Sequence, residues 1–254
     1  MKDKKNAKDK NRISPFAVII SILMPVVAAV WLFQFTGGGY RMTVPLRGDF
    51  EEIAENVYIN QNFSGNKEDV AALVGSARER DAAFFGDLQC TDRTVVIVCD
   101  DGELLKKLGG DHDTQSVVFP FRKSYICVSD EYLDVDILAH EITHAELHGR
   151  LKEKALKRIP TWFDEGIATQ NDCREKYSPA IWAEQTDNGK NTIALADMDE
   201  REEFYAGTEE DRHFRYLIAK HEVSEWMETH GREGLLALID RMNNGEEFAA
   251  AYGE

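Results

Sequence analysis

The sequence is poor in cysteine and contains no Cys-x-x-Cys pair. Because cysteine-based zinc knuckles are built from such closely spaced pairs, a site of that kind is disfavoured. Internal repeats are also absent, so the sequence does not indicate a repeat protein. The chain has four cysteines, Cys90, Cys99, Cys127 and Cys173. In an oxidising compartment they could form disulfides in three ways, and the sequence does not choose among these pairings.

Charged side chains are missing altogether from residues 13–35. An apolar run of this length crosses the ~30 Å hydrocarbon core of a bilayer when it is helical. The run is longer than the core of a typical signal peptide and ends in aromatic residues, which favours an uncleaved transmembrane signal anchor. A cleaved signal peptide is the alternative, since Ala28 and Ala29 are the small residues that a cleavage site requires.

Residues 1–12 form a basic tail that carries six Lys or Arg and two Asp, a net charge of +4. Basic residues before an anchor predict a cytoplasmic N-terminus, so the remainder lies outside the cytoplasm as a single-pass cell-membrane protein. Residues 36–48 then read as a linker, with a flexible tether at Thr36–Tyr40, and residues 49–254 as the extracytoplasmic domain. The lipid bilayer is therefore a predicted partner of the N-terminal helix.

The formal net charge of −16 leaves about −20 on the chain beyond the basic tail. Such a surface repels the phosphates of nucleic acids and of anionic lipid headgroups. We therefore predict no nucleic-acid partner, while the charge alone does not identify a substrate.

Hydrophobic patterns predict an α+β fold for this domain, with a small sheet first and helices after it. Four short β-branched runs predict strands, at residues 57–59, 93–100, 115–121 and 124–129. A helix with an apolar face is predicted over residues 64–85. From residue 130 onward helical patterns dominate, over residues 133–148, 161–170, 210–229 and 232–242, with a break between the last two at Gly231.

The stretch Ile137–Arg150 contains the pattern H-E-x-x-H at His140, Glu141 and His144. Residues four apart lie on one face of a helix, so both imidazoles can bind one metal ion. Glu141 would lie beside the open coordination position, where a carboxylate can take a proton from water. His148 is a poor third ligand, because three ligands spaced along one helix drift away from a single tetrahedral centre.

A third ligand is better supplied by a second predicted helix that starts after Pro160. Glu165 falls within its first turns, whereas the adjacent Asp164 points about 100° away, so only one of the two carboxylates can face the metal. Gly166 and Ala168 are small and would let the helices approach closely.

Together the two motifs resemble the gluzincin zinc metallopeptidases, in which H-E-x-x-H is followed by a glutamate in a W-x-x-E-G-x-A setting. Trp162, Glu165, Gly166 and Ala168 match that second element, and the P-x-W-x-x-E-G segment is similar to the short bacterial membrane-anchored branch. The resemblance implies a zincin-like domain with one Zn²⁺ ion. It also implies that His140, His144 and Glu165 are the zinc ligands and that Glu141 is the general base and acid.

Two departures from that group are visible. Thermolysin-like members have an aspartate where this chain has Thr169, and the segment with which aminopeptidases bind a free amino terminus is absent.

Peptide hydrolysis also requires a donor of a hydrogen bond to the developing oxyanion. The last helices resemble the family more loosely, and this resemblance favours Tyr216 as the oxyanion donor, a second catalytic residue beside Glu141. Alternatively, Tyr216 is a core aromatic whose hydroxyl is satisfied by a hydrogen bond.

These observations lead us to expect a membrane-anchored zinc-dependent endopeptidase that hydrolyses a peptide or protein substrate near the membrane. The alternative is a non-catalytic zinc-containing binding or scaffold protein outside the cytoplasm. That alternative predicts a closed site with four protein ligands, completed by His148 or a cysteine.

Overall fold

The computed structural model describes residues 36–109, 114–119 and 123–253, together with residues 23–25, 27 and 33. The predicted basic tail, residues 1–12, and most of the predicted anchor, residues 13–35, lie outside these described residues. Within the described part of the chain, no helix is both long enough and apolar enough to cross a membrane.

A five-stranded mixed sheet forms the first half of the domain, in the order β1-β2-β3-β5-β4. The central strands β2, β3 and β5 run parallel, whereas β1 and β4 join the edges antiparallel. Their bounds are β1 Phe50–Ala54, β2 Val57–Asn60, β3 Thr94–Cys99, β4 Thr114–Phe119 and β5 Lys123–Ser129. Four of the five strands were predicted; β1 was missed because its sequence, FEEIA, is acidic and half-exposed.

Helices cover both faces of the sheet because side chains alternate between the faces along each strand. On one face, Val96 and Val98 of β3 pack with apolar residues of α3, Lys67–Phe85, and α5, Val135–Arg150. On the other face, Val95 and Ile97 pack against Leu105 of the short helix α4, Gly102–Lys107. Helix α5 is thus anchored on the sheet by its apolar side.

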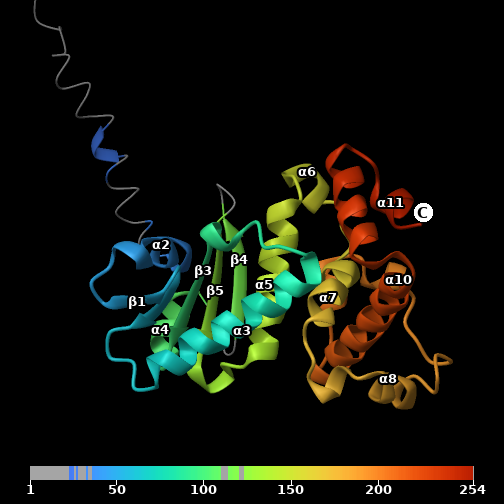
Figure 1. The fold of residues 1–254 in the computed structure, drawn as a ribbon, viewed down its shortest axis with the longest axis horizontal. Coiled ribbons are helices and arrows are strands. Elements are labelled where there is room, and N and C mark those ends of the chain that lie inside the picture. Colours follow the sequence, from blue (N-terminus) through green and yellow to red (C-terminus); the bar gives the residue numbers. More distant parts are fainter. Residues whose placement is uncertain are drawn as a thin grey trace, which may run out of the picture.

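The second half of the molecule is helical and lies on the opposite side of α5 from the sheet (Figure 1). Its core is built from α7, Thr161–Gln170, and the long helix α10, Glu209–Asn243, which carries the predicted break at Gly231 with φ 60°. Shorter helices surround this pair: α6 Glu153–Leu156, α8 Pro179–Gln185, α9 Arg201–Phe204 and α11 Phe248–Tyr252. Short 3₁₀ turns complete the chain: η1 Val44–Leu46, η2 Thr91–Arg93, η4 Asp130–Tyr132, η5 Glu175–Tyr177 and η6 Leu195–Met198.

The expectation of a flexible tether at Thr36–Tyr40 was wrong. Residues Gly37–Thr43 form helix α2, which begins where the Thr36 side chain accepts a hydrogen bond from the Gly39 amide. Arg41 and Val44 are buried, so this segment packs on the domain. The physical reason is that a cap and two buried side chains outweigh the flexibility of three consecutive glycines.

All four cysteines are free thiols in this structure. Cys90, Cys99 and Cys127 are buried, and Cys173 is exposed. None of the three pairings that the sequence allowed is formed.

Candidate metal centre

Helices α5 and α7 bring the predicted ligands together where the two halves of the domain meet. Helix α5 begins directly after its N-cap Asp134, whose side chain accepts a hydrogen bond from the Asp136 amide. The apolar side of α5 faces the sheet, so its histidines face the helical half. Helix α7 packs against α5 and directs Glu165 toward the same point. His140, His144 and Glu165 form one buried group, as the spacing predicted.

The ligand atoms of this group form a nearly equilateral triangle. The Nε2 atoms of His140 and His144 lie 3.2 Å apart. Glu165 Oε2 lies 3.4 Å from the first of these nitrogens and 3.3 Å from the second. Ligand atoms placed 2.0–2.1 Å from a tetrahedral zinc ion lie about 3.3 Å from one another. The side chains therefore already have the spacing that a tetrahedral metal site requires.

The hydrogen bonding of the group also fits a cation. Glu165 Oε2 is buried and has no hydrogen-bond partner among the described residues, and the same is true of His140 Nδ1. An unpaired buried carboxylate oxygen is costly. Because Oε2 is the atom that faces both Nε2 atoms, a metal ion at the centre of the triangle would satisfy it.

Asp164 supports the site from outside the triangle. Its Oδ1 lies 2.9 Å from His144 Nδ1, so the carboxylate accepts that N–H and leaves Nε2 free to bind a metal. His148 contacts the same carboxylate, with Nε2 at 2.9 Å and 2.8 Å from its two oxygens. Of the two adjacent carboxylates only Glu165 belongs to the triangle, while Asp164 forms a second candidate metal-binding group with His144 and His148. The contact of Asp164 with His144 was not foreseen.

The electrostatics of the group favour bound positive charge. Although burial opposes charge on the His144 imidazole, the carboxylates of Asp164 and Glu165 raise its pKa well above the ordinary value. Burial likewise opposes ionisation of Glu165, but His144 and His140 lower its pKa well below the ordinary range. Such paired shifts mark a site that attracts a cation, whether a proton or a metal ion.

Glu141 follows His140 on α5, and the same neighbouring charges and burial affect its carboxyl. Burial raises the pKa of its carboxyl, with the charges of His140 and His144 acting in the opposite direction and that of Glu165 adding to the rise. A carboxylate so placed is suited to exchange protons with a nearby water molecule.

No fourth protein ligand joins the triangle within the described chain. His148 is held by Asp164, one turn further along α5, and does not reach the Nε2 atoms. The closed four-ligand site that a purely structural zinc prefers is therefore not formed by His148. Three protein ligands with one open position are typical of a catalytic metal site.

Tyr216, the predicted oxyanion donor, lies beside the triangle on α10. Its ring centroid is 6.1 Å from that of His140, and its ring packs edge-on against Phe204 at 5.1 Å. Sequence reasoning missed a second tyrosine, Tyr205, whose hydroxyl donates a hydrogen bond to Oε1 of Glu165. No local pattern could have revealed Tyr205, because it follows Glu165 by 40 residues.

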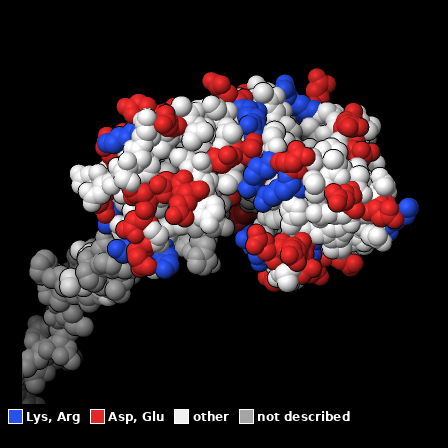
Figure 2. Space-filling model, turned by 90° about the horizontal axis from the view of Figure 1, so that it is seen from below, with Lys and Arg blue, Asp and Glu red and all other residues white. Residues whose placement is uncertain are grey.

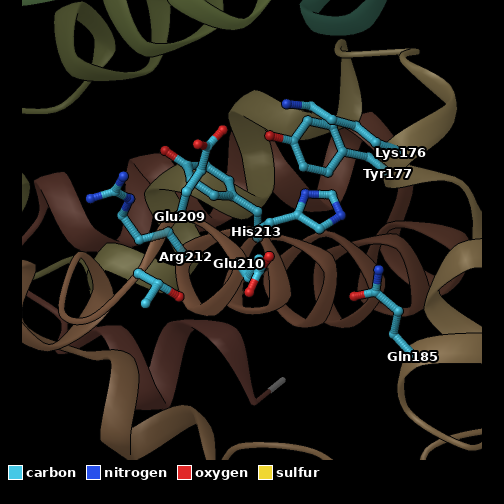
Figure 3. A pocket seen from close by; sticks show the side chains of 9 residues that line it. Lys176, Tyr177, Gln185, Glu209, Glu210, Arg212 and His213 are labelled. Atoms are coloured by element: carbon cyan, nitrogen blue, oxygen red, sulfur yellow. The ribbon is translucent and has the colours of Figure 1, made fainter.

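A cleft of about 820 Å³ is lined in part by Tyr216, while His140, His144 and Glu165 are not among its lining residues. Figure 3 shows the lining side chains: His213 lies beside Tyr177 and Lys176, and Glu209 and Arg212 come from the same first turns of α10. The Tyr177 ring stacks on His213 with centroids 5.3 Å apart and lies 5.9 Å from the Tyr216 ring. Aromatic rings and charged side chains of both signs therefore line the cleft, and among them Tyr216 also lies near His140.

The small residues of α7 act differently from expectation. The predicted close approach was between α5 and α7, but a Cβ added at Gly166 would lie 2.7 Å from the Ala219 carbonyl oxygen of α10. Gly166 therefore lets α10 approach, which brings Tyr216 near Glu165. Thr169 donates its hydroxyl hydrogen bond to the Glu165 carbonyl, so it does not replace the orienting aspartate of the thermolysin-like enzymes.

Acidic side chains are abundant on the face of the molecule drawn in Figure 2, in keeping with the net charge of −16. Figure 2 shows clusters of Asp and Glu over one face, with a group of Lys and Arg beside the hollow that separates the two halves. The hollow and its mixed charges distinguish this side of the domain from a uniformly acidic surface.

Comparison with known proteins does not identify a family. No protein-family model matches the chain, and no curated protein shows significant similarity to it. The established result is a buried His140, His144 and Glu165 group on α5 and α7, consistent with a metal site of the H-E-x-x-H type.

Proposed function

We propose that this chain is a zinc-dependent endopeptidase, anchored in a cell membrane with its catalytic domain outside the cytoplasm. The observation that carries the proposal is the triangle of ligand atoms with edges of 3.2 to 3.4 Å, to which Glu141 is adjacent in the sequence. Two nitrogens and one carboxylate oxygen are a ligand set that zinc accepts in hydrolases. The gluzincin resemblance of the two motifs supports the same reaction.

Each residue of the site then has a role in peptide hydrolysis. A bound zinc ion would supply Lewis acidity toward the scissile carbonyl and increase the acidity of water. Glu141 takes a proton from the attacking water and passes it to the leaving amine nitrogen. Tyr216, whose ring centroid lies 6.1 Å from that of His140, is the candidate donor of a hydrogen bond to the developing oxyanion.

The cleft is suited to a polypeptide segment. Its volume of about 820 Å³ lies within the range of pockets that hold medium-sized ligands. An extended chain advances roughly 3.3 Å per residue, so a cleft of this volume takes a short segment of chain on one side of the scissile bond. The absence of the aminopeptidase segment from the sequence favours cleavage within chains. The predicted anchor would confine the enzyme to substrates near the membrane.

Glu141→Gln tests the catalytic part of the proposal. The variant keeps the size and burial of the side chain but removes the base, so cleavage of a mixed peptide library should fall by at least about a hundredfold. The matched control is Glu131→Gln, an exposed glutamate in the turn before α5. Wild-type protein that holds zinc but cleaves no peptide would instead favour the non-catalytic alternative.

A further inference from the structure

Tyr205 holds the outer oxygen of the third candidate ligand. Its hydroxyl donates to Glu165 Oε1, while Oε2 has no hydrogen-bond partner among the described residues and faces both Nε2 atoms. The two oxygens of the Glu165 carboxylate therefore have different partners: Oε1 accepts the hydrogen bond of Tyr205, and Oε2 lies near the two histidine nitrogens. A carboxylate fixed at Oε1 cannot rotate freely about its last bond, and Oε2 stays aimed at the centre of the triangle.

The backbone around Tyr205 is fixed by α10. Arg215 donates through Nη1 to the carbonyls of Phe204 and Ala206, at 3.4 and 2.6 Å, one on each side of Tyr205. Phe204 is fully buried and packs edge-on against the Tyr205 ring at 5.4 Å. The guanidinium of Arg201 lies over the Tyr205 ring, 4.8 Å from its centroid. These contacts restrict the positions that the Tyr205 side chain can take.

The same segment is fixed to α7, the helix that carries Glu165. Asp199 accepts a hydrogen bond from the Thr161 amide at 2.8 Å through its carbonyl, and one from Trp162 Nε1 at 3.0 Å through its carboxylate. Trp162 is one of the residues by which the sequence resembles the gluzincins. Tyr205 and Glu165 are therefore held in one frame made of α7, α9 and α10.

The segment of Tyr205 also packs against Tyr216. The Phe204 ring lies edge-on to both tyrosine rings, with its centroid 5.4 Å from that of Tyr205 and 5.1 Å from that of Tyr216. The residue pair that reaches Glu165 Oε1 is therefore also in contact with the candidate oxyanion donor.

We propose that Tyr205 is a positioning residue of the metal centre, which holds Glu165 Oε1 and so keeps Oε2 aimed at the two histidine nitrogens. This inference rests on the proposed function. It adds a residue that neither motif contains, since Tyr205 lies beyond both of them in the sequence.

The test is the affinity for zinc of Tyr205→Phe, measured in the full-length protein by competition with a chelating dye. Removing a residue that orients a metal ligand typically weakens metal affinity about 10- to 100-fold, and we expect a loss in that range. The matched control is Tyr252→Phe, which removes a similar hydroxyl that donates to Glu222 at 3.1 Å on α10, away from the triangle. Tyr216→Phe should lower kcat while zinc affinity stays near that of the wild type.

Each outcome decides the question. Weakened zinc binding in Tyr205→Phe, with Tyr252→Phe unchanged and similar melting temperatures of the metal-free proteins, supports the positioning role. A zinc affinity equal to that of the wild type overturns it while leaving the proposed function intact. Absence of zinc binding in the wild type overturns the proposed function and the positioning role together. If Tyr205→Phe does not fold, Arg215→Met replaces it, and a zinc affinity that equals the wild type would again count against the role.

Discussion

The buried carboxyl of Asp81 gives a prediction whose size follows from the structure. Asp81 lies on α3 with no exposed surface, and its Oδ1 accepts hydrogen bonds from Thr143 of α5 and from Asn171 at 2.9 Å. Its Oδ2 has no hydrogen-bond partner within the described chain. Burial raises the pKa of this carboxyl from 3.8 to about 8, against the opposing effect of the two hydrogen bonds.

Folded Asp81 therefore keeps its proton at neutral pH, whereas the unfolded chain loses it near pH 3.8. Between these values the folded state binds one proton more than the unfolded state, so stability falls as the pH rises. The loss is about 1.4 kcal/mol per pH unit, or about 2.7 kcal/mol from pH 5 to pH 7. Asp81→Asn mimics the protonated carboxyl and does not titrate, so it removes this loss.

The assay is equilibrium urea unfolding of the wild type and Asp81→Asn at several pH values between 5 and 8, both without metal. The free energy of unfolding of the variant minus that of the wild type should increase by about 2.7 kcal/mol from pH 5 to pH 7. Asp240→Asn, at an exposed position of α10, is the control and should show a constant difference. Parallel pH profiles for Asp81→Asn and the wild type would refute the assignment of a neutral buried carboxyl.

Two further predictions concern the metal centre and its frame. Asp164→Asn removes the carboxylate that accepts the His144 N–H, so zinc affinity measured by dye competition should fall about 10- to 100-fold; an unchanged affinity would remove Asp164 from the site. Gly166→Ala places a Cβ 2.7 Å from the Ala219 carbonyl oxygen, so it should lower the free energy of unfolding by about 1–3 kcal/mol. Gly75→Ala, on α3 where a Cβ meets no atom within 4 Å, should instead stabilise by roughly 0.5–1 kcal/mol, and similar effects of the two changes would contradict the packing argument.

The sequence alone was sufficient for the features that depend on helical spacing. His140 and His144 converge because residues four apart share a helix face, and Glu165 arrives from a helix whose predicted bounds agree with α7. The break at Gly231 was predicted for the same kind of reason, since glycine readily adopts the positive φ found there. Local rules fix such features without knowledge of the tertiary structure.

Features that depend on contacts between distant segments were not predictable in this way. The orientation of Asp164 on α7 was foreseen, but its contact with His144 Nδ1 depends on how α5 and α7 cross. Tyr205 reaches Glu165 only because Arg215 and Asp199 hold its segment between two helices. Strand β1 was missed because an edge strand with one exposed face tolerates an acidic sequence.

The metal content of the purified protein tests the central claim most directly. Elemental analysis should find one zinc ion per chain in the wild type and in Glu141→Gln, because Glu141 is not a ligand. It should find essentially none in His144→Ala, which removes one corner of the triangle. Zinc absent from the wild type, or retained equally in His144→Ala, would contradict the claim that His140, His144 and Glu165 hold a metal ion.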